Sequence, residues 1–297
     1  MRRLQIDKFI NSDIASIIDK YNYYFNGSFS RVDSSKKYVK ILSESRLLCY
    51  EDFVYSICIF DEAEKIIKGD IDIFTFEIIS DEKVMCMYYD DIKIWNPNTG
   101  DIEKVLKGHT DYVSCLLKLS NKRIVSASHD RTIRIWNLDT GETEKILTGH
   151  TKYITCLAKL PNGRIVSGSG DKTLRIWNIE TGQTENILKG HTYHIRRVIA
   201  LPDGRVVSSS RDKTIRIWNL GKVQHVLEGH TDTPTFLSII PDGRIISSGF
   251  DGLLIIWNPD TGKMEKKIHG NYIIDMKILK DQRLLCILSD RSLCIYD

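Results

Sequence analysis

Long apolar runs and an excess of charge of one sign are both missing from this chain of 297 residues. No run approaches the ~20 residues that a membrane-spanning helix requires. The start, MRRLQIDKFI, carries two arginines, but Asp7, Lys8 and Asn11 interrupt the apolar residues behind them, which argues against a usual signal peptide. The net charge of +3 is too small to indicate nucleic acid or an anionic membrane. We therefore expect neither kind of partner.

Cysteine pairs are lacking as well. The number of cysteines is odd, no C-x-x-C is present, and most of them lie inside apolar, strand-like runs: Cys49, Cys58, Cys86, Cys115, Cys156, Cys286 and Cys294. This usage is typical of reduced core residues rather than of a disulfide framework. It predicts an intracellular, cytoplasmic protein and leaves the nucleus open.

Motifs of catalysis and metal binding are absent from the sequence. It contains no H-E-x-x-H, no P-loop, no G-x-S-x-G and no cluster of Cys and His ligands. We therefore predict no catalytic residue, no metal site and no cofactor.

An internal repeat is the strongest signal that the sequence does contain. Tryptophans at residues 95, 136, 177, 218 and 257 are spaced by 41, 41, 41 and 39 residues, and a further 39 residues lead to Tyr296. Gly-His pairs begin at residues 108, 149, 190 and 229, and His269 continues the series. Each of these five histidines precedes its aromatic partner by 27 residues.

One unit of the repeat reads as strands separated by turns. In GHTKYITCLAKLPNGRIVSGSGDKTLRIWN, the runs YITCLAKL, RIVSGS and TLRIWN have the apolar and β-branched content of strands. The segments PNG and GDK between them are turn sequences. The next segment, TGQTENILKG, opens with a turn and carries a fourth strand. The repeat therefore predicts an all-β chain of four-stranded units.

Repeats of this length with Gly-His and Trp marks resemble the WD-repeat family, whose members are β-propellers with four strands in each antiparallel blade. The resemblance runs from about Lys104 to Asp297. The sequence departs from the family by ending its third strands with Trp-Asn rather than Trp-Asp. Asn is also a short polar turn-former, and Asp appears in this place only at Asp61 and Asp297.

Counting third-strand aromatics predicts seven blades, with six as the alternative if the first unit is only a cap. The aromatics are Phe60, Trp95, Trp136, Trp177, Trp218, Trp257 and Tyr296. Residues 23–297 would then form a single propeller.

The chain stops after a third strand, which would leave an open sheet edge. We expect residues 23–30 (YYFNGSFS) to supply the missing strand and close the ring. Residues 1–22 have apolar side chains at helical spacing and predict a short helix, either packed on the propeller or available to a partner.

Each well-formed repeat also contains His, Ser, Asp and Trp at fixed offsets of 17, 4 and 6 residues. The four sets are His109, Ser126, Asp130, Trp136; His150, Ser167, Asp171, Trp177; His191, Ser208, Asp212, Trp218; and His230, Ser247, Asp251, Trp257. A Ser-His-Asp trio suggests a hydrolase, but one active site does not need four copies in register with the fold. The resemblance implies instead a structural chain of hydrogen bonds from indole to hydroxyl to imidazole to carboxylate.

This pattern weakens toward both ends of the sequence. The last unit has His269, Cys286, Asp290 and Tyr296. In the second unit, Met85 and Tyr89 replace Ser and Asp, and the first unit has Tyr50 and Val54 there.

The resemblance also implies a binding face, built from the third and fifth residues after each His and from the residue before the turn Asp. The side chains in these positions are Tyr112, Ser114, His129, Tyr153, Thr155, Gly170, His194, Arg196, Arg211, Thr233, Thr235, Phe250, Tyr272, Ile274 and Ser289. Tyr, Phe and Arg dominate interface hot spots. Arg196, Arg197 and Arg211 could hold an acidic or phosphorylated peptide. Tyr112, Tyr153 and Tyr272 could pack against an apolar side chain or a methylated cationic one. The alternative is that these are ordinary rim residues and that a partner uses the sides of the blades.

The arginines Arg134, Arg175 and Arg216 recur inside third strands, and we interpret them as structural rather than as a nucleic-acid stripe. The sequence thus predicts a non-catalytic interaction scaffold that binds a protein or peptide as a monomeric propeller within a larger complex. The alternatives are a substrate-recognition subunit of a ubiquitin-ligase-type complex and, less favoured, a propeller enzyme.

Overall fold

The computed structural model describes residues 36–43, 46–51, 54–59, 65–68, 76–80, 83–96, 99, 101–271, 273–278, 284–288 and 293–296. Side chains are described for residues 83–96, 99 and 101–271 and for Ile273, Met276 and Cys286. All regular elements among these residues are β-strands, and no helix among them could cross a membrane. The predicted helix in residues 1–22 and the predicted closing strand in residues 23–30 lie outside the described residues.

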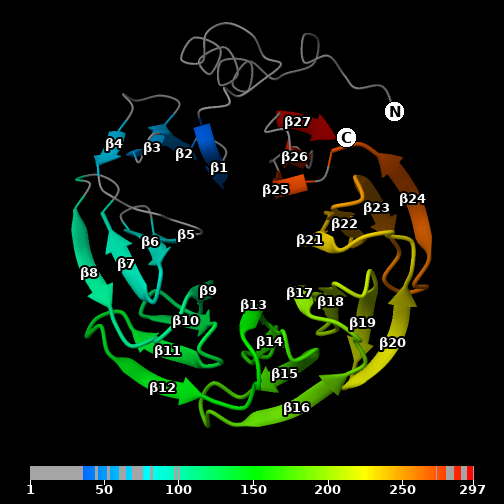
Figure 1. Ribbon diagram of the computed structural model, residues 1–297, viewed down its shortest axis with the longest axis horizontal. Coiled ribbons are helices and arrows are strands. Elements are labelled where there is room, and N and C mark those ends of the chain that lie inside the picture. Colours follow the sequence, from blue (N-terminus) through cyan, green and yellow to red (C-terminus); the bar gives the residue numbers. More distant parts are fainter. Residues whose placement is uncertain are drawn as a thin grey trace, which may run out of the picture. The chain divides into compact units, whose positions relative to one another are not determined.

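The chain divides into two compact units, one formed by Asp72–Ile274 and the other by Met1–Ile71 together with Asp275–Asp297. The Asp72–Ile274 unit contains five four-stranded sheets, in each of which consecutive strands are hydrogen-bonded neighbours. Figure 1 shows these five sheets side by side in chain order, each with its first strand innermost and its fourth strand outermost. This is the repeated blade that the sequence predicts.

The first three of these sheets cover residues 76–189. Their strands are β5 (Phe76–Ser80), β6 (Lys83–Tyr88), β7 (Asp91–Trp95) and β8 (Ile102–Leu106); β9 (Val113–Lys118), β10 (Arg123–Ser128), β11 (Ile133–Asn137) and β12 (Thr143–Leu147); and β13 (Ile154–Lys159), β14 (Ile165–Ser169), β15 (Thr173–Trp177) and β16 (Thr184–Lys189). The other two sheets contain β17 (Ile195–Ala200), β18 (Val206–Ser210), β19 (Ile215–Asn219) and β20 (Lys222–Leu227); and β21 (Pro234–Ile239), β22 (Ile245–Gly249), β23 (Leu253–Trp257) and β24 (Met264–His269).

The remaining strands form two further antiparallel sheets. One has four strands, namely β1 (Lys36–Ser43), β2 (Arg46–Glu51), β3 (Val54–Ile59) and β4 (Lys65–Lys68). The other has three, namely β25 (Ile273–Ile278), β26 (Leu284–Leu288) and β27 (Leu293–Tyr296). The aromatic Phe60 lies outside the described residues, whereas Tyr296 ends β27 and is paired with Leu284.

The core of the Asp72–Ile274 unit lies between consecutive sheets. All residues of the second strands β14, β18 and β22 are buried, which requires cover on both faces. Their sequences, IVSGS, VVSSS and IISSG, provide the small side chains that let neighbouring sheets approach. A representative cluster joins Ile135 and Leu147 of one sheet to Ile154 and Trp177 of the next. The fourth strands are largely exposed, because no further strand covers them within the blade.

The asparagine that follows each third strand has two roles in the structure. The Asn178 Oδ1 atom accepts hydrogen bonds from the backbone N–H groups of Glu180 (2.9 Å) and Thr181 (3.0 Å), which starts the turn to β16. Its Nδ2 donates to Glu185 Oε1 on β16 at 3.1 Å. Asn258 makes the same set of bonds. An aspartate has no amide to donate to a glutamate, so these blades favour Trp-Asn over Trp-Asp.

Candidate functional site

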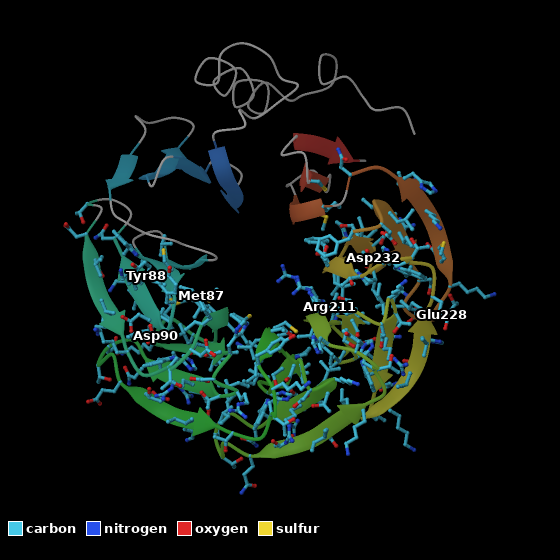
Figure 2. The ribbon with its side chains drawn as sticks, in the orientation of Figure 1. Met87, Tyr88, Asp90, Arg211, Glu228 and Asp232 are labelled. Atoms are coloured by element: carbon cyan, nitrogen blue, oxygen red, sulfur yellow. The ribbon has the colours of Figure 1, made fainter. Side chains whose placement is uncertain are left out.

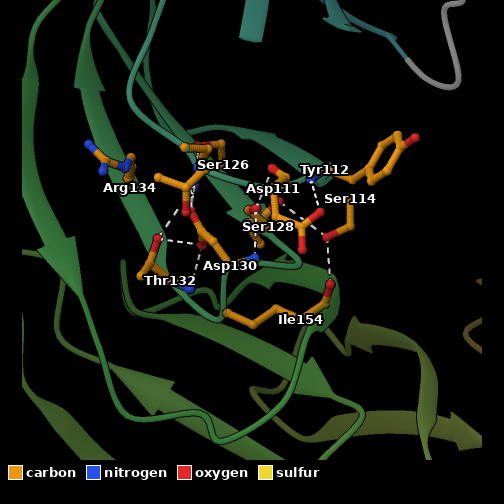
Figure 3. Close-up of polar contacts among 12 residues, drawn as sticks. Asp111, Tyr112, Ser114, Ser126, Ser128, Asp130, Thr132, Arg134 and Ile154 are labelled. Atoms are coloured by element: carbon orange, nitrogen blue, oxygen red, sulfur yellow. Dashed lines mark hydrogen bonds and ion pairs between the residues drawn. The ribbon is translucent and has the colours of Figure 1, made fainter. Parts of the chain in front are cut away.

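Four chains of hydrogen bonds connect the His, Ser, Asp and Trp residues of the repeats. In the β9–β12 sheet, the Trp136 indole donates to Ser126 Oγ at 2.7 Å, and that hydroxyl lies 2.7 Å from His109 Nε2. His109 Nδ1 lies 2.7 Å from Asp130 Oδ2. Part of this cluster, with Ser126, Asp130 and Thr132, is drawn in Figure 3. The three other sets have the same connections at 2.7–3.2 Å.

The turn aspartate is the most heavily bonded member of each chain. The Asp171 carboxylate accepts hydrogen bonds from the backbone N–H groups of Thr151 (3.0 Å) and Thr173 (2.9 Å), from the Thr173 hydroxyl, and from His150. Burial works toward a higher pKa of Asp171, but the bonds from His150 and Thr173 outweigh it and hold that pKa well below its ordinary value. The pKa values of Asp130 and Asp212 are lowered in the same way. For Asp251, the hydrogen bonds that outweigh burial and lower the pKa come from the N–H groups of Leu253 and Thr231 and from His230. The aspartate therefore fixes both the histidine and the turn before the third strand.

These serines are placed for structure rather than for nucleophilic attack. Ser167 is fully buried between the indole of Trp177 and the imidazole of His150. Its hydroxyl has no open side toward a substrate, and the same holds for Ser126, Ser208 and Ser247, all fully buried. A Ser-His-Asp hydrolase needs an exposed hydroxyl, so these trios do not form an active site of that kind.

In the Gly-His pairs that begin at residues 108, 149 and 190, the glycine makes room for the recurring arginine. A Cβ atom on Gly190 would lie 2.7 Å from an Arg216 guanidinium nitrogen and 3.2 Å from the Trp218 ring. The guanidinium of Arg134 lies over the ring of Trp136 at 5.8 Å, and Arg175 is placed likewise over Trp177. The guanidinium groups of Arg134 and Arg175 also reach the threonine hydroxyls that open the fourth strands. These arginines are packed on their own blades, as the sequence predicts.

The network is incomplete in the β5–β8 sheet. Met85, which stands in the place of the serine, is fully buried, and the buried Trp95 Nε1 has no hydrogen-bond partner among the described residues. A thioether in place of a hydroxyl accounts for this loss. In the last repeat, His269 ends β24 and is exposed, and Asp290 lies outside the described residues.

A continuous row of aromatic side chains crosses four consecutive sheets. Its neighbouring rings have centroids 4.9–6.1 Å apart, in the order Tyr89, Tyr112, His129, Tyr153, His194 and Tyr193. We call these six residues the aromatic row. Tyr89, Tyr112 and Tyr193 are each 42–50% exposed. Exposed rings therefore lie at both ends of the row.

Backbone hydrogen bonds bring the members of the row together. The His129 N–H donates to the Tyr112 carbonyl at 2.8 Å, and the Arg211 N–H donates to the His194 carbonyl at 2.9 Å. In the β13–β16 sheet, the Gly170 N–H donates to the Tyr153 carbonyl at 2.9 Å, and a Cβ on Gly170 would lie 2.8 Å from the Tyr153 ring. Glycine in this position lets the tyrosine ring lie against the turn.

Basic side chains gather around the His194 end of the row. Burial, followed by the positive charges of Lys152, Arg211 and Lys172, lowers the pKa of His194. The pKa of Arg196 is lowered by burial and by the charges of Arg197 and Arg211. We call Lys152, Lys172, Arg196 and Arg211 the basic cluster. None of the four forms an ion pair with an acid of the described part of the chain. The cluster therefore leaves positive charge uncompensated.

Other residues predicted for the binding face have different positions. The hydroxyls of Ser114 and Thr155 donate to carbonyls of the next sheet, those of Ile154 and Ile195, at 2.6 and 2.8 Å. Figure 3 shows Ser114 turned toward Ile154 while the Tyr112 ring points away from this network. Thr233 is buried, whereas Phe250 is 51% exposed. The structure thus gives Ser114 and Thr155 a role in joining sheets.

The remaining residues predicted for this face are Thr235, Ile274, Tyr272 and Ser289. Thr235 has a buried hydroxyl without a partner in the described part of the chain. Ile274 follows the first residue of β25, and Tyr272 and Ser289 lie outside the described residues.

The face also contains residues that sequence reasoning did not place there. Tyr89 and Tyr193 lie at the two ends of the aromatic row, and Lys152 and Lys172 belong to the basic cluster. Lys152 and Tyr193 occupy the same position, two residues after the repeat histidine, so a wider reading of that loop would have found both. Within the described residues, no group of three or more His, Cys, Asp or Glu side chains is arranged to hold a metal ion.

The comparisons with known proteins agree with this geometry. A model of the WD domain, G-beta repeat family matches residues 100–137, 141–178, 182–219 and 221–258, which is just over half of the chain. Each matched stretch contains one complete His-Ser-Asp-Trp set. The structure is similar to that of the WD40 β-propeller domain of Doa1, with a TM-score of 0.74 and 20% identity over 89% of this chain and 93% of that chain. At this identity the likeness bears on the fold alone. No curated protein matches the sequence.

Proposed function

The chain belongs to the WD domain, G-beta repeat family, and on this premise we propose that it is a non-catalytic interaction module that binds a partner peptide or protein across the aromatic row. WD40 propellers typically mediate contacts between proteins. The observation that supports the proposal is an exposed row of rings beside a basic cluster without acidic partners. Tyrosine and arginine are the side chains that contribute most to protein interfaces.

The partner that fits this surface is acidic or phosphorylated. Guanidinium groups form charge-assisted hydrogen bonds with carboxylates and phosphates, and lysine ammonium groups add further positive charge. Lys172 and Arg211 are exposed, so both can reach a ligand, while the half-buried Arg196 lies behind them. We propose that the chain is intracellular and acts as a monomer within a larger complex.

The same proposal includes a closed ring of seven blades. The β1–β4 sheet would be the first blade and the β25–β27 sheet the last. The second of these has three strands among the described residues, which is consistent with a fourth strand supplied by residues 23–30. Deleting residues 1–30 should then lower the melting temperature and the solubility. A deletion variant that stays a monomer with an unchanged melting temperature would contradict the closure of the ring by residues 23–30.

The binding proposal is tested with three probes: a degenerate phosphoserine peptide pool, the same pool without phosphate, and inorganic phosphate alone. The full chain should bind the phosphorylated pool most tightly. The double variant Lys172→Glu/Arg211→Glu should lose this preference, because it reverses two charges of the basic cluster. Lys189→Glu/Lys222→Glu is the matched control, since it makes the same charge change on the exposed outer strands β16 and β20.

The outcomes separate the sources of binding. Equal affinity for both peptide pools would contradict a phosphorylated partner. Binding of millimolar inorganic phosphate without any binding of peptide would show an anion site and contradict the interaction module. If the cluster variant and the control variant lose the same affinity for the phosphorylated pool, the loss comes from the change in net charge and not from this surface.

A further inference from the structure

We propose that the Tyr89–Tyr112 end of the aromatic row binds a lysine or arginine side chain of the same peptide whose phosphate is held by the basic cluster. This inference rests on the proposed function and adds to it the chemistry and the orientation of the ligand. The two ends of one continuous row carry opposite charge, so a peptide with separated charges fits in one direction only.

The ring geometry at this end is suited to a cation. Tyr89 and Tyr112 have centroids 5.3 Å apart and ring planes inclined by 44°, and Tyr88 meets Tyr89 edge-on at 5.2 Å. Faces of tyrosine rings attract ammonium and guanidinium groups within ~6 Å of the centroid. The same cluster already holds one cation of the chain, because Lys93 Nζ lies 3.7 Å from the Tyr88 ring centroid.

Two carboxylates adjoin these rings. Asp90 follows Tyr89 and Asp111 precedes Tyr112, and both aspartates are exposed. The Tyr112 N–H donates to Asp111 Oδ1 at 2.7 Å, which fixes that carboxylate against the backbone of Tyr112. Neither carboxylate is in an ion pair with a described residue, whereas the neighbouring Asp91 lies 3.9 Å from Lys107 Nζ. The pair of carboxylates therefore provides negative charge that a ligand cation can neutralise.

Charge changes sign along the row. Asp90 and Asp111 lie at the Tyr89–Tyr112 end, where Lys93 is held on the Tyr88 ring. Beyond that end, Arg131 in the turn after His129 is the first basic residue on the way to the basic cluster. Figure 2 shows Asp90 and Arg211 on different sheets of the Asp72–Ile274 unit, with Asp232 near the next blade beyond Arg211. A ligand with charge of only one sign would be attracted to one end and repelled from the other.

The length of the row limits the spacing of the two ligand charges. From Tyr112 to His194 the row takes three ring-to-ring steps of 5.1–6.1 Å. An extended peptide advances ~3.3 Å per residue. The cation and the phosphorylated residue should therefore be separated by no more than about five residues, with apolar side chains between them over His129 and Tyr153.

The test uses phosphoserine peptide pools with one fixed lysine, placed two to five residues before or after the phosphoserine, and matched pools with glutamine instead. The chain should bind its preferred lysine pool about tenfold more tightly than the matching glutamine pool, and only with the lysine on one side. Asp90→Asn/Asp111→Asn should abolish this difference while binding the glutamine pool as the unmodified chain does. Asn keeps the acceptor for the Tyr112 N–H, so the loop is preserved.

The matched control is Asp101→Asn/Glu228→Gln, which removes the same charge from two exposed carboxylates outside the row. It should leave the preference for lysine intact. If phosphoserine is required but lysine and glutamine pools bind equally, the cation site is wrong and the proposed function stands. If phosphoserine makes no difference in any pool, the phosphorylated partner of the proposed function is wrong and this inference fails with it. If the preference for lysine survives in Asp90→Asn/Asp111→Asn, the lysine of the peptide does not bind at the Tyr89–Tyr112 end.

Discussion

Tyr153 Oη and His194 Nδ1 lie 2.6 Å apart, a hydrogen bond that connects two consecutive blades at the middle of the aromatic row. The two side chains come from equivalent loops, before β13 and before β17, 41 residues apart. A neutral imidazole accepts a hydrogen bond from the phenol at Nδ1, and burial together with the surrounding positive charge favours that neutral form. The basic cluster thus helps to hold the rings in the arrangement that a ligand meets.

The first prediction concerns the titration of His194. In the free chain its pKa should lie below the ordinary value of about 6.5, because burial and the charges of Lys152, Arg211 and Lys172 disfavour the protonated ring. A bound phosphate favours the protonated form, so a phosphopeptide should raise this pKa, and affinity should increase as the pH falls through it. NMR of the imidazole carbon resonance measures both values.

Two variants make the test of His194 specific. Lys172→Gln should raise the pKa in the free chain, since it removes one of the opposing charges, whereas Lys189→Gln on β16 should not. A pKa at or above the ordinary value in the free chain would contradict the electrostatic description of this end of the row.

The second prediction concerns the support of Tyr153 by Gly170. Alanine at this position would place its Cβ 2.8 Å from the tyrosine ring, so the ring must move. An aromatic contact is worth about 0.5–1.5 kcal/mol, so Gly170→Ala should weaken phosphopeptide binding by roughly two- to thirteenfold. Gly270→Ala, where a Cβ meets open space, is the control and should bind normally. Unchanged binding by Gly170→Ala, with the His194 resonance unmoved, would contradict a role for this ring.

The His-Ser-Asp-Trp chains could be predicted from the sequence because their atoms belong to one blade. Within an antiparallel sheet the offset between residues determines which side chains face each other, so spacings of 17, 4 and 6 residues sufficed for His150, Ser167, Asp171 and Trp177. The aromatic row depends on contacts between blades, such as His129 with Tyr153 at 5.1 Å. The spacing of residues within one repeat cannot predict a contact between two different blades.

The same distinction explains the residues that were misplaced or missed. Ser114 and Thr155 have the repeat position of face residues, but their hydroxyls reach carbonyls of the next sheet. The repeat pattern indicates Tyr89 only as a replacement for the turn aspartate. The structure shows that its ring belongs to the aromatic row, because its centroid lies 5.3 Å from that of Tyr112.

The third prediction concerns the stability provided by one hydrogen-bonded chain. Asp171→Ala leaves the His150 imidazole and the N–H and hydroxyl of Thr173 without their acceptor. An unsatisfied buried partner costs about 1–3 kcal/mol, so the free energy of unfolding should fall by that amount. Asp101→Ala, an exposed carboxylate, should change it by less than about 0.5 kcal/mol. Urea unfolding measures both, and equal stability of the two variants would contradict the structural role of the chain.

The last prediction rests on the lowered pKa values of Asp130, Asp171, Asp212 and Asp251. A carboxyl whose pKa is lower in the folded than in the unfolded chain binds its proton first in the unfolded state. Its stabilising contribution is therefore complete above the unfolded value of about 3.9 and is lost as the pH falls toward the folded value. Because four blades have this arrangement, the free energy of unfolding should decline steeply below about pH 4.

A variant separates these aspartates from the other acids of the chain. Asp171→Ala has lost one of the four contributions, so its unfolding free energy should depend less on pH below about pH 4 than that of the unmodified chain, and the two curves should converge toward acid. Asp101→Ala should keep the full dependence, because its carboxylate is exposed. Parallel curves for Asp171→Ala and the unmodified chain would mean that the acid sensitivity comes from elsewhere, for example from the arginine pairs of Asp203 and Asp242.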